Sequence, residues 1–301
     1  MHPNNLHKEG YDFSRLLKAS PELAQFVVHQ ADRRPTIDFS NALAVKTLNR
    51  ALLKHYYKLE IWDIPDGYLC PPVPGRADYI HHIADLLATT PPRQKNKIVG
   101  LDIGVGANVI YPIIGSQLFG WHFVGSELDP TSFKSAQLIV NANKNIKNSV
   151  TIRQQTNPAQ IFKGIIQPDD QFSFTLCNPP FHASAQEANA GSQRKNHNLG
   201  RNKQKRGNKS TPFTKHEKQH LNFAGQHNEL WCHGGEAAFI KQMIIESLDY
   251  AKQVQWFTCL VSKKQNLHAI YQQLNDIQAT DVKTINMSQG SKISRFVAWR
   301  F

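Results

Sequence analysis

The chain has 301 residues with 40% hydrophobic content, which is enough for one large α/β domain with additions or for two modest domains. Lys and Arg (35) outnumber Asp and Glu (23), and the resulting net charge of +12 and pI near 9.5 favour a polyanionic partner, nucleic acid first. The four cysteines form no CxxC pair, the N-terminus lacks an apolar signal core, and no run approaches the roughly 18 apolar residues of a membrane span, so we expect a soluble, cytoplasmic protein without a disulfide framework.

Residues 1–93 are predicted to form a helical extension that binds RNA. A helix running through Tyr57 carries a row of cations spaced four residues apart, which places them on one ridge of its surface. The row consists of Lys46, Arg50, Lys54 and Lys58. Such a row is normally a solvated face. Four cations with no acid among them repel one another, however, so a ridge that follows RNA phosphates remains an open alternative.

The stretch from Lys97 to Asn108 predicts a cofactor loop, because an apolar strand runs into a glycine turn that is followed by a helix over 109–119. Glycines at Gly104 and Gly106 allow the backbone to approach a ligand closely. Asn108 replaces the third glycine of a dinucleotide fingerprint, and Asp102 precedes the first glycine. This order is similar to that of S-adenosylmethionine methyltransferases rather than dehydrogenases.

A second strand over 121–126 ends at an acid about twenty residues beyond the glycine turn, where a ribose hydroxyl pair is usually bound. Glu127 is the first choice for this contact and Asp129 the alternative. A third strand near 150–153 leads to Thr156 and Asn157, which could read the edge of an adenine ring.

The apolar run Phe172–Leu176 predicts a strand that must end before Pro179 and Pro180, since proline lacks an amide proton. Asn178 is then held extended at the strand end. Its amide oxygen and the Pro179 carbonyl can accept both protons of a planar exocyclic amine while the ring stacks on Phe181, which would free the nitrogen lone pair to attack an activated methyl group. The plain alternative is a turn in which Asn178 caps local backbone.

Residues 183–233 are rich in Lys, Arg, Asn, Gln and Gly, and this composition predicts a mobile insertion. It is a candidate RNA clamp, with a solvated insertion as the alternative. The RNA contacts proposed within it are Arg201, Lys203, Lys205 and Arg206. Several His residues and a Cys follow, but their spacing fits no standard zinc site, so we predict no metal.

The C-terminal part predicts a helix over 236–252, a strand over 255–261, a helix over 267–274 and strands over 282–287 and 294–301. The last connection is too short for a parallel crossover, so the final two strands must be antiparallel. The fold class is therefore α/β. We expect a Rossmann-like class I methyltransferase with a mostly parallel seven-stranded sheet that ends in an antiparallel hairpin, spanning residues 94–301 after the helical extension.

With these motifs in place, the chain resembles the RlmF family of 23S rRNA adenine-N6 methyltransferases and, more distantly, eukaryotic enzymes that methylate a small nuclear RNA. The resemblance spans nearly the whole chain. It rests on His2-Pro3-Asn4, the segment from Pro72 to His81, Leu101 to Asn108 with Ile110-Tyr111-Pro112, Gly120 to Glu127, Cys177 to Phe181, Gly234-Gly235-Glu236 and Ala298-Trp299-Arg300-Phe301. The insertion at 183–233 departs most from the family.

The resemblance implies methyl transfer from S-adenosylmethionine to N6 of one adenine in 23S rRNA, at the position usually numbered 1618. The substrate would be 23S rRNA or a large-subunit assembly intermediate, and the enzyme a monomer. The cofactor and target site implied by motif position consists of Arg76, Gly104, Asn108, Glu127, Thr156 and Asn178. The loop with Lys263 and Lys264 would lie near the cofactor, where these lysines could gate access.

Two other functions stay open. A glutamine side-chain amide is also planar and conjugated, so N5-methylation of a protein glutamine is a second enzyme reading. A non-catalytic RNA-binding assembly factor that keeps the fold is the third. An RNA affinity that falls steeply with salt would distinguish an RNA enzyme from a protein-glutamine methyltransferase. Failure to bind S-adenosylmethionine would favour the non-catalytic assembly factor.

Overall fold

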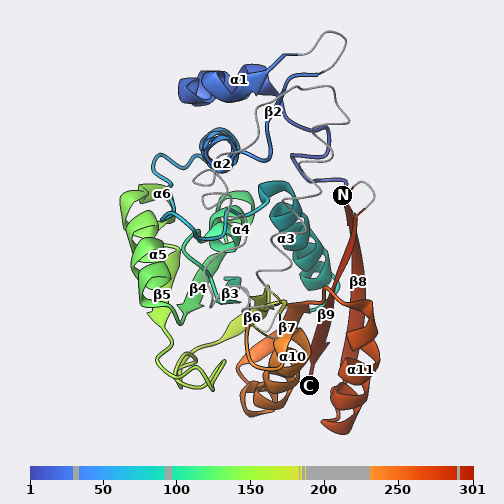
Figure 1. Cartoon of the computed structure of the whole chain (residues 1–301). Helices are drawn as coiled ribbons and strands as arrows, with labels where there is room; N and C mark the ends of the chain where they lie inside the picture. Colours follow the sequence, from blue (N-terminus) through green and yellow to red (C-terminus); the bar gives the residue numbers. More distant parts are fainter. Residues whose placement is uncertain (30–33, 92–96, 183, 185–186, 188–230, 290–291) are drawn as a thin grey trace.

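The computed structural model describes residues 1–29, 34–91, 97–182, 184, 187, 231–289 and 292–301. Its centre is a seven-stranded sheet with the strand order β5-β4-β3-β6-β7-β9-β8 (Figure 1). The strands are β3 (Val99–Ile103), β4 (His122–Glu127), β5 (Val150–Gln154), β6 (Phe172–Cys177), β7 (Val254–Leu260), β8 (Asp281–Gln289) and β9 (Lys292–Arg300). The strands from β5 to β7 are parallel, whereas β9 is antiparallel to both of its neighbours. The predicted fold class is confirmed.

The register of the central strands brings the predicted motifs to one edge of the sheet. Ile103, the last residue of β3, pairs with Ser126 of β4 on one side and with Cys177 of β6 on the other. The residues that follow these three are Gly104, Glu127 and Asn178. They therefore emerge side by side at the carboxyl ends of parallel strands, where open α/β sheets bind ligands.

Helices cover both faces of the sheet, and each face has its own hydrophobic cluster. One face carries α3 (Val73–Ala88), α4 (Ile110–Phe119) and α5 (Pro130–Ala142), and the other carries α10 (Gly235–Ser247) and α11 (Leu267–Asp276) (Figure 1). Three short helical segments lie between these elements, namely α6 (Lys144–Lys147), η2 (Leu248–Tyr250) and η3 (Lys264–Asn266). The helix predicted over 236–252 thus changes to 3-10 geometry after Ser247.

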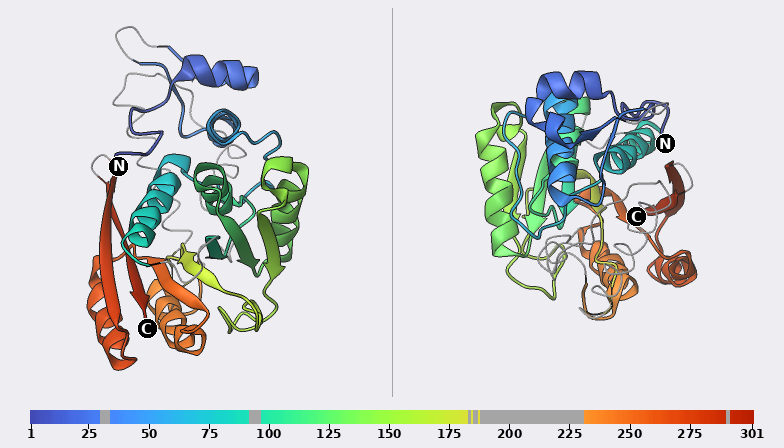
Figure 2. Two further views of the ribbon diagram at one scale, coloured as in Figure 1. Left: turned by 180° about the vertical axis from the view of Figure 1, so that it is seen from behind. Right: turned by 45° about the horizontal axis from the view of Figure 1, so that its top comes forward.

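The N-terminal region comprises α1 (Phe13–Ala19), η1 (Pro21–Phe26), β1 (Val27–Val28), β2 (Thr36–Ile37) and α2 (Ala42–Tyr57). Figures 1 and 2 show α1 and α2 at one end of the molecule and α10 and α11 at the other. The side chains of α1 and α2 share one hydrophobic cluster with α3, α4 and α5. No described helix has the length and apolarity needed to cross a membrane.

Polar contacts also tie the N-terminal region to the sheet. The Asn143 side chain accepts from the Glu60 and Ile61 amides at 2.9 and 3.1 Å and donates to the Ile61 carbonyl at 2.6 Å. The Tyr79 hydroxyl on α3 lies 2.6 Å from the Thr258 hydroxyl on β7. The boundary predicted at residues 93 and 94 falls among residues that the structure does not describe. Because the hydrophobic packing is continuous across the two regions, the boundary stays a proposal about where the RNA-binding part ends.

Candidate active site

A cavity of about 490 Å³ lies at the carboxyl ends of β3, β4 and β6, a size typical of ligand sites. Seven of the predicted site residues line it, contributed by α3, the glycine turn, β4 and the segment after β6. They are Arg76, Gly104, Gly106, Asn108, Glu127, Asn178 and Pro180. The structure therefore brings together motifs that are as far apart in the sequence as Arg76 and Pro180.

The glycine turn presents its backbone to this cavity. Gly104 and Gly106 have φ angles of +69° and +67°, which disfavour residues with a side chain. A Cβ built on Gly104 would meet no atom within 4 Å, so a larger residue there would project into open space beside the cavity. Val109, which follows the turn, has a φ of 53°, an unusual value for a β-branched residue. The turn is held in a conformation that leaves room for a ligand against its backbone.

Glu127 is fixed in place by three backbone amides. Its Oε2 accepts from Gly106 at 2.8 Å, and its Oε1 accepts from Leu128 and Asp129 at 2.8 and 2.9 Å. Asp129, the alternative ribose ligand, is instead the N-cap of α5 and accepts from Ser132 at 2.8 Å. Because Glu127 lines the cavity and Asp129 does not, the geometry favours Glu127.

Arg76 and Asp102 lie close to each other but at different depths. Nη1 of Arg76 donates to the Tyr111 hydroxyl at 2.7 Å, and both residues line the cavity. Asp102 is 1% exposed and does not line it. Neither carboxyl oxygen of Asp102 has a hydrogen-bond partner in the described part of the chain. Burial raises the pKa of Asp102 well above its ordinary value, the Glu127 carboxylate raises it further, and Arg76 opposes the shift. Asp102 thus lies one layer behind the cavity wall.

Asn178 is half-buried and lines the cavity at the end of β6. Its Oδ1 is buried and has no hydrogen-bond partner among the described residues. A buried acceptor without a partner costs free energy, and a hydrogen-bond donor on a bound ligand would remove that cost. Pro180 also lines the cavity, whereas Pro179 is buried behind it and Phe181, half-buried, is not part of the lining. Two of the four predicted catalytic positions therefore border the cavity directly.

After β5 the structure places Gln155 at the cavity wall, and the cofactor contact predicted for Thr156 stays a prediction. Thr156 is exposed and does not line the cavity, while its neighbour Gln155 is buried and does. The Gln155 side chain donates to the Lys163 carbonyl at 3.0 Å and accepts from the Asn157 amide at 3.0 Å, which holds it inward. Successive residues of an extended chain face opposite ways, so the Gln155 side chain points inward while that of Thr156 points outward.

Sequence reasoning also missed the cavity residues at the end of the insertion. Trp231, Cys232 and His233 line the cavity, although residues 183–233 were predicted as one mobile segment. The signal that could have found them is the tryptophan, a large apolar residue three positions before the glycine pair that opens α10. Lys263 and Lys264 do not line the cavity, and gating by them stays a prediction.

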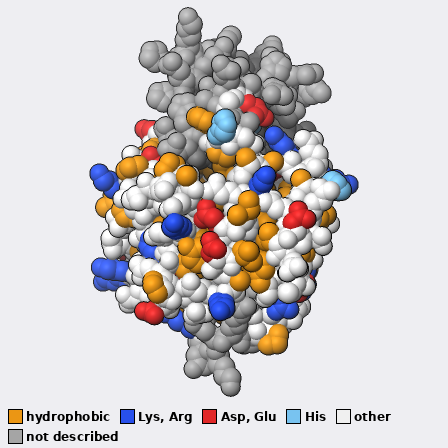
Figure 3. All heavy atoms as spheres, turned by 90° about the horizontal axis from the view of Figure 1, so that it is seen from below, with side chains coloured by type: hydrophobic (Ala, Val, Ile, Leu, Met, Phe, Trp, Pro, Cys, Tyr) orange, Lys and Arg blue, Asp and Glu red, His pale blue; other side chains and the backbone are white. Residues whose placement is uncertain are grey.

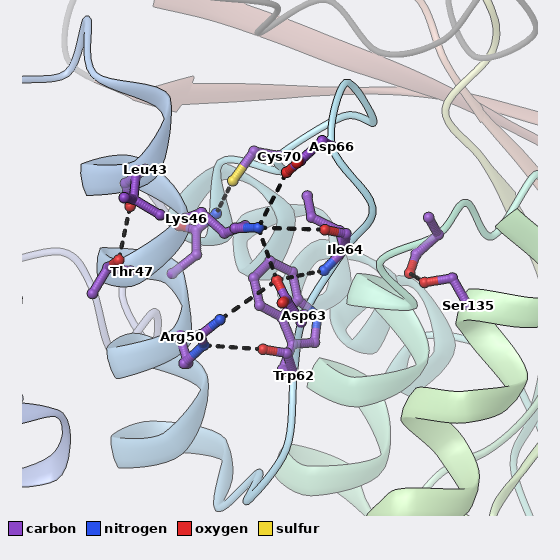
Figure 4. Close-up of polar contacts among 12 residues, drawn as sticks. Leu43, Lys46, Thr47, Arg50, Trp62, Asp63, Ile64, Asp66, Cys70 and Ser135 are labelled. Atoms are coloured by element: carbon purple, nitrogen blue, oxygen red, sulfur yellow. Dashed lines mark hydrogen bonds and ion pairs between the residues drawn. The ribbon is translucent and has the colours of Figure 1, made fainter. Parts of the chain in front are cut away.

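The row of cations on α2 is not continuous (Figure 4). Nζ of Lys46 lies 3.1 Å from Asp63 and 3.6 Å from Asp66, and Nη2 of Arg50 lies 3.4 Å from Asp63. The acids come from the loop after the helix, so the helix sequence alone did not reveal them. Lys54 and Lys58 are exposed.

The remaining predicted RNA contacts, Arg201, Lys203, Lys205 and Arg206, lie outside the described residues. On the face shown in Figure 3, Lys and Arg side chains are spread singly, with acidic and apolar side chains between them. The described residues on that face do not form a concentrated basic patch.

One group of possible metal ligands occurs within the described ranges, formed by His2, His82 and Asp85, whose ligand atoms lie within 4.8 Å of one another. The direct contact of 2.9 Å between the His2 ring and the Asp85 carboxylate accounts for this pairing without an ion. Neither His2 nor His82 lines the cavity.

Comparisons with known proteins agree with this geometry. Residues 1–301 match a family model described as RNA methyltransferase. The chain is 56% identical over 308 residues to ribosomal RNA large subunit methyltransferase F of Pseudoalteromonas atlantica, covering 100% of this chain and 92% of that protein. It is 53% identical over 304 residues to the protein of the same name from Flavobacterium johnsoniae, covering 100% of this chain and 93% of that protein.

Two solved structures resemble the fold along its whole length. The N-terminal domain of human METTL16 in complex with SAH has a TM-score of 0.76 and 26% identity, covering 100% of this chain and 98% of that one. The hMettl16 catalytic domain in complex with a MAT2A 3'UTR hairpin has a TM-score of 0.80 and 29% identity, with coverages of 100% and 97%.

Proposed function

Because this chain belongs to the RNA methyltransferase family that includes ribosomal RNA large subunit methyltransferase F, we propose that it methylates N6 of one adenine in 23S rRNA, using S-adenosylmethionine. The observation that carries this proposal is the buried, unpartnered Oδ1 of Asn178 on a cavity shared with Gly104 and Glu127. The names of the relatives support the substrate class, and the SAH complex of human METTL16 supports the cofactor. The adenine numbered 1618 is the proposed target.

The residues around the cavity fit this cofactor. The turn at Gly104 and Gly106 lets backbone lie against it, and Glu127, which lines the cavity, is the proposed acceptor for the ribose hydroxyl groups. Arg76 is the one Lys or Arg among the described lining residues and suits the carboxylate of the amino-acid part. When bound, S-adenosylmethionine supplies an electrophilic methyl group. Beside the turn, the Asn108 side chain accepts from the Ile110 amide at 3.1 Å and donates to the Leu69 carbonyl at 3.4 Å, and Asp102 is buried one layer behind.

The protein's own contribution to the reaction is mainly positioning. Oδ1 of Asn178 and the Pro179 carbonyl accept hydrogen bonds from the target amine and hold its lone pair toward the reacting carbon. Pro179 restricts Asn178 to an extended conformation, which limits the positions available to the amide. Holding two reactants in near-attack geometry can lower a barrier by several kcal/mol, so no strong base is required. After methyl transfer the nitrogen carries one proton too many, and this proton passes to water while Oδ1 of Asn178 acts only as a hydrogen-bond acceptor.

We propose that the substrate is 23S rRNA or a large-subunit assembly intermediate, bound by a monomer. The net charge of +12 suits a polyanion. Lys54 and Lys58 of the 1–93 extension and the basic residues of the 183–233 insertion are the proposed phosphate contacts.

Mapping N6-methyladenine in rRNA from cells with and without this protein tests the proposal. One adenine in 23S rRNA should lose its methyl group on deletion and regain it with the wild-type gene. A gene carrying Asn178→Ala should fail to restore it. An unchanged 23S rRNA, together with a lost methylglutamine in a protein, would instead favour the glutamine alternative.

A further inference from the structure

Trp231 is joined directly to the segment that carries Asn178. Its backbone forms a parallel bridge with His182, and the Cys232 amide donates to the His182 carbonyl at 3.2 Å. On its other side, the Gly235 amide donates to the Cys232 carbonyl at 2.9 Å at the start of α10. Trp231 is thus held between the end of the Asn178 segment and the start of α10.

The indole N–H of Trp231 is buried and has no hydrogen-bond partner within the described chain. Three other tryptophans show the usual arrangement, in which a buried indole finds an acceptor. Trp62 donates to the Asn108 carbonyl at 2.9 Å, Trp256 to the Thr90 hydroxyl at 3.1 Å and Trp299 to the Ser247 hydroxyl at 2.9 Å. Trp231 is the exception among these four, and it is the one that lines the cavity.

Unpartnered polar atoms gather on the two bridged segments. Of the ten buried side-chain atoms without a hydrogen-bond partner among the described residues, three belong to Asn178, His182 and Trp231. Nδ1 of His182 still has the Glu187 carboxylate 3.7 Å away, so Asn178 and Trp231 are the two with no charged partner in the described part of the chain either. Burying such atoms is costly, so their concentration at one place points to a ligand that supplies the missing partners. Asn178 offers an acceptor there, and the indole of Trp231 can only donate.

This pair of groups complements one edge of an amino base. Adenine carries a donor, its N6 amine, beside ring nitrogens that accept, whereas guanine and uracil carry a keto oxygen at the corresponding position. With the amine on Asn178 Oδ1, an adjacent ring nitrogen is left to accept from an N–H group. A keto base would instead place its oxygen against the Asn178 oxygen, and the two acceptors would repel.

We propose that the indole N–H of Trp231 donates a hydrogen bond to the ring nitrogen beside the target amine, N1 or N7, and so helps select adenine over keto bases. This inference rests on the proposed function, since it concerns the same cavity. It assigns Trp231 to base recognition, with the methyl donor bound by other residues.

The test uses Trp231→Phe, which keeps an aromatic wall and removes the N–H. The substrate is a synthetic RNA hairpin carrying the mapped target adenine. We expect kcat/KM to fall about tenfold, the size of one lost hydrogen bond, while the Kd for S-adenosylmethionine measured by calorimetry stays within about twofold. Trp121→Phe is the matched control. Trp121 is buried in the core beside Phe119 and does not line the cavity, so its replacement should leave base preference unchanged.

Hairpins with 1-deazaadenosine or 7-deazaadenosine at the target make the assignment specific. The wild-type enzyme should lose about tenfold in kcat/KM on one of these analogues, and Trp231→Phe should lose nothing further on that analogue. Equal wild-type rates on adenosine and both analogues would overturn the inference, even if the variant failed to fold. So would a variant that retains the full wild-type rate. A wild-type enzyme inactive on the unsubstituted RNA would instead overturn the proposed function.

Discussion

Glu127 and Asp129 are two acids separated by a single residue, yet they have different contacts. Three backbone amides orient the Glu127 carboxylate at the cavity, and Asp129 caps α5. The same contrast separates Gln155 from Thr156. At the scale of single residues, therefore, neighbouring side chains of similar chemistry take unrelated roles because strand ends and helix caps point them in different directions.

Asn178→Ala should separate binding from turnover. Removing the amide leaves the glycine turn and Glu127 unchanged, so the Kd for S-adenosylmethionine should change by no more than about threefold. The acceptor for the target amine is lost, and kcat should fall by at least about a hundredfold. Calorimetry and tritiated methyl transfer to RNA measure the two effects. Methylation at the normal rate would show that Asn178 does not position the amine.

Asp102→Asn should change how stability depends on pH. The pKa of Asp102 is raised in the folded protein by burial and by Glu127. A raised folded pKa contributes stability below the unfolded value, near 3.9, and this contribution is lost as pH rises through the folded pKa. Asn cannot ionise, so the Tm of the variant minus that of the wild type should increase from pH 5 to pH 8. A difference that stays flat over this range would show that Asp102 does not titrate as described.

At the scale of elements, α10 and the loop after β7 depend on one buried acid. Glu236 is 1% exposed, and its carboxylate accepts from the Ser262 and Lys263 amides and from the Asn266 side chain. These contacts fix the loop that carries Lys263 and Lys264. They also explain the acid that follows the glycine pair in the sequence.

Glu236→Gln should loosen this loop while keeping the volume of the side chain. A glutamine has one acceptor oxygen in place of two, so at least one buried donor loses its partner at a cost of about 2 kcal/mol. We expect a lower Tm and faster hydrogen exchange at residues 262–266. Exchange in β3 serves as the reference and should change only by the amount that the loss of global stability explains. Unchanged exchange in the loop would contradict the role given to Glu236.

The paired and exposed halves of α2 lead to a further prediction. Lys54 and Lys58 are exposed, whereas Lys46 and Arg50 are neutralised by the loop at 63–66. Lys54→Gln combined with Lys58→Asn should reduce the slope of log K for RNA against log salt by about 1.5. Asn suits position 58, where φ is 57°.

The control for this prediction is Lys134→Gln with Lys241→Gln, which removes the same charge from α5 and α10. It should leave the salt slope nearly unchanged. Equal effects of the two pairs would mean that α2 contributes only to net charge.

What could be predicted from the sequence follows the range of the interactions involved. The seven strands of the main sheet, the glycine turn and the end of β6 before Pro179 are set by local patterns and were predicted, whereas the two-residue strands β1 and β2 were not. The acids that pair with Lys46 and Arg50 lie in a loop beyond the helix, so only the fold reveals them. Trp231 is placed by a bridge to His182 across almost fifty residues, for which the sequence carries no periodic signal.

At the scale of the whole molecule, the N-terminal region and the sheet form one packed unit. The chain's amino terminus lies beside the β8–β9 hairpin, where its amine donates to the Ser288 hydroxyl at 3.3 Å (Figure 1). α3 carries Arg76 to the cavity and reaches β7 through Tyr79. RNA bound by the N-terminal region would therefore be held at a fixed position relative to the cavity.

The most direct test incubates the purified protein with tritiated S-adenosylmethionine and rRNA from cells that lack it, then separates the nucleosides. We predict that the label co-elutes with N6-methyladenosine and maps to one position in 23S rRNA. Label in another nucleoside, or label that stays with protein after RNase treatment, would contradict the account.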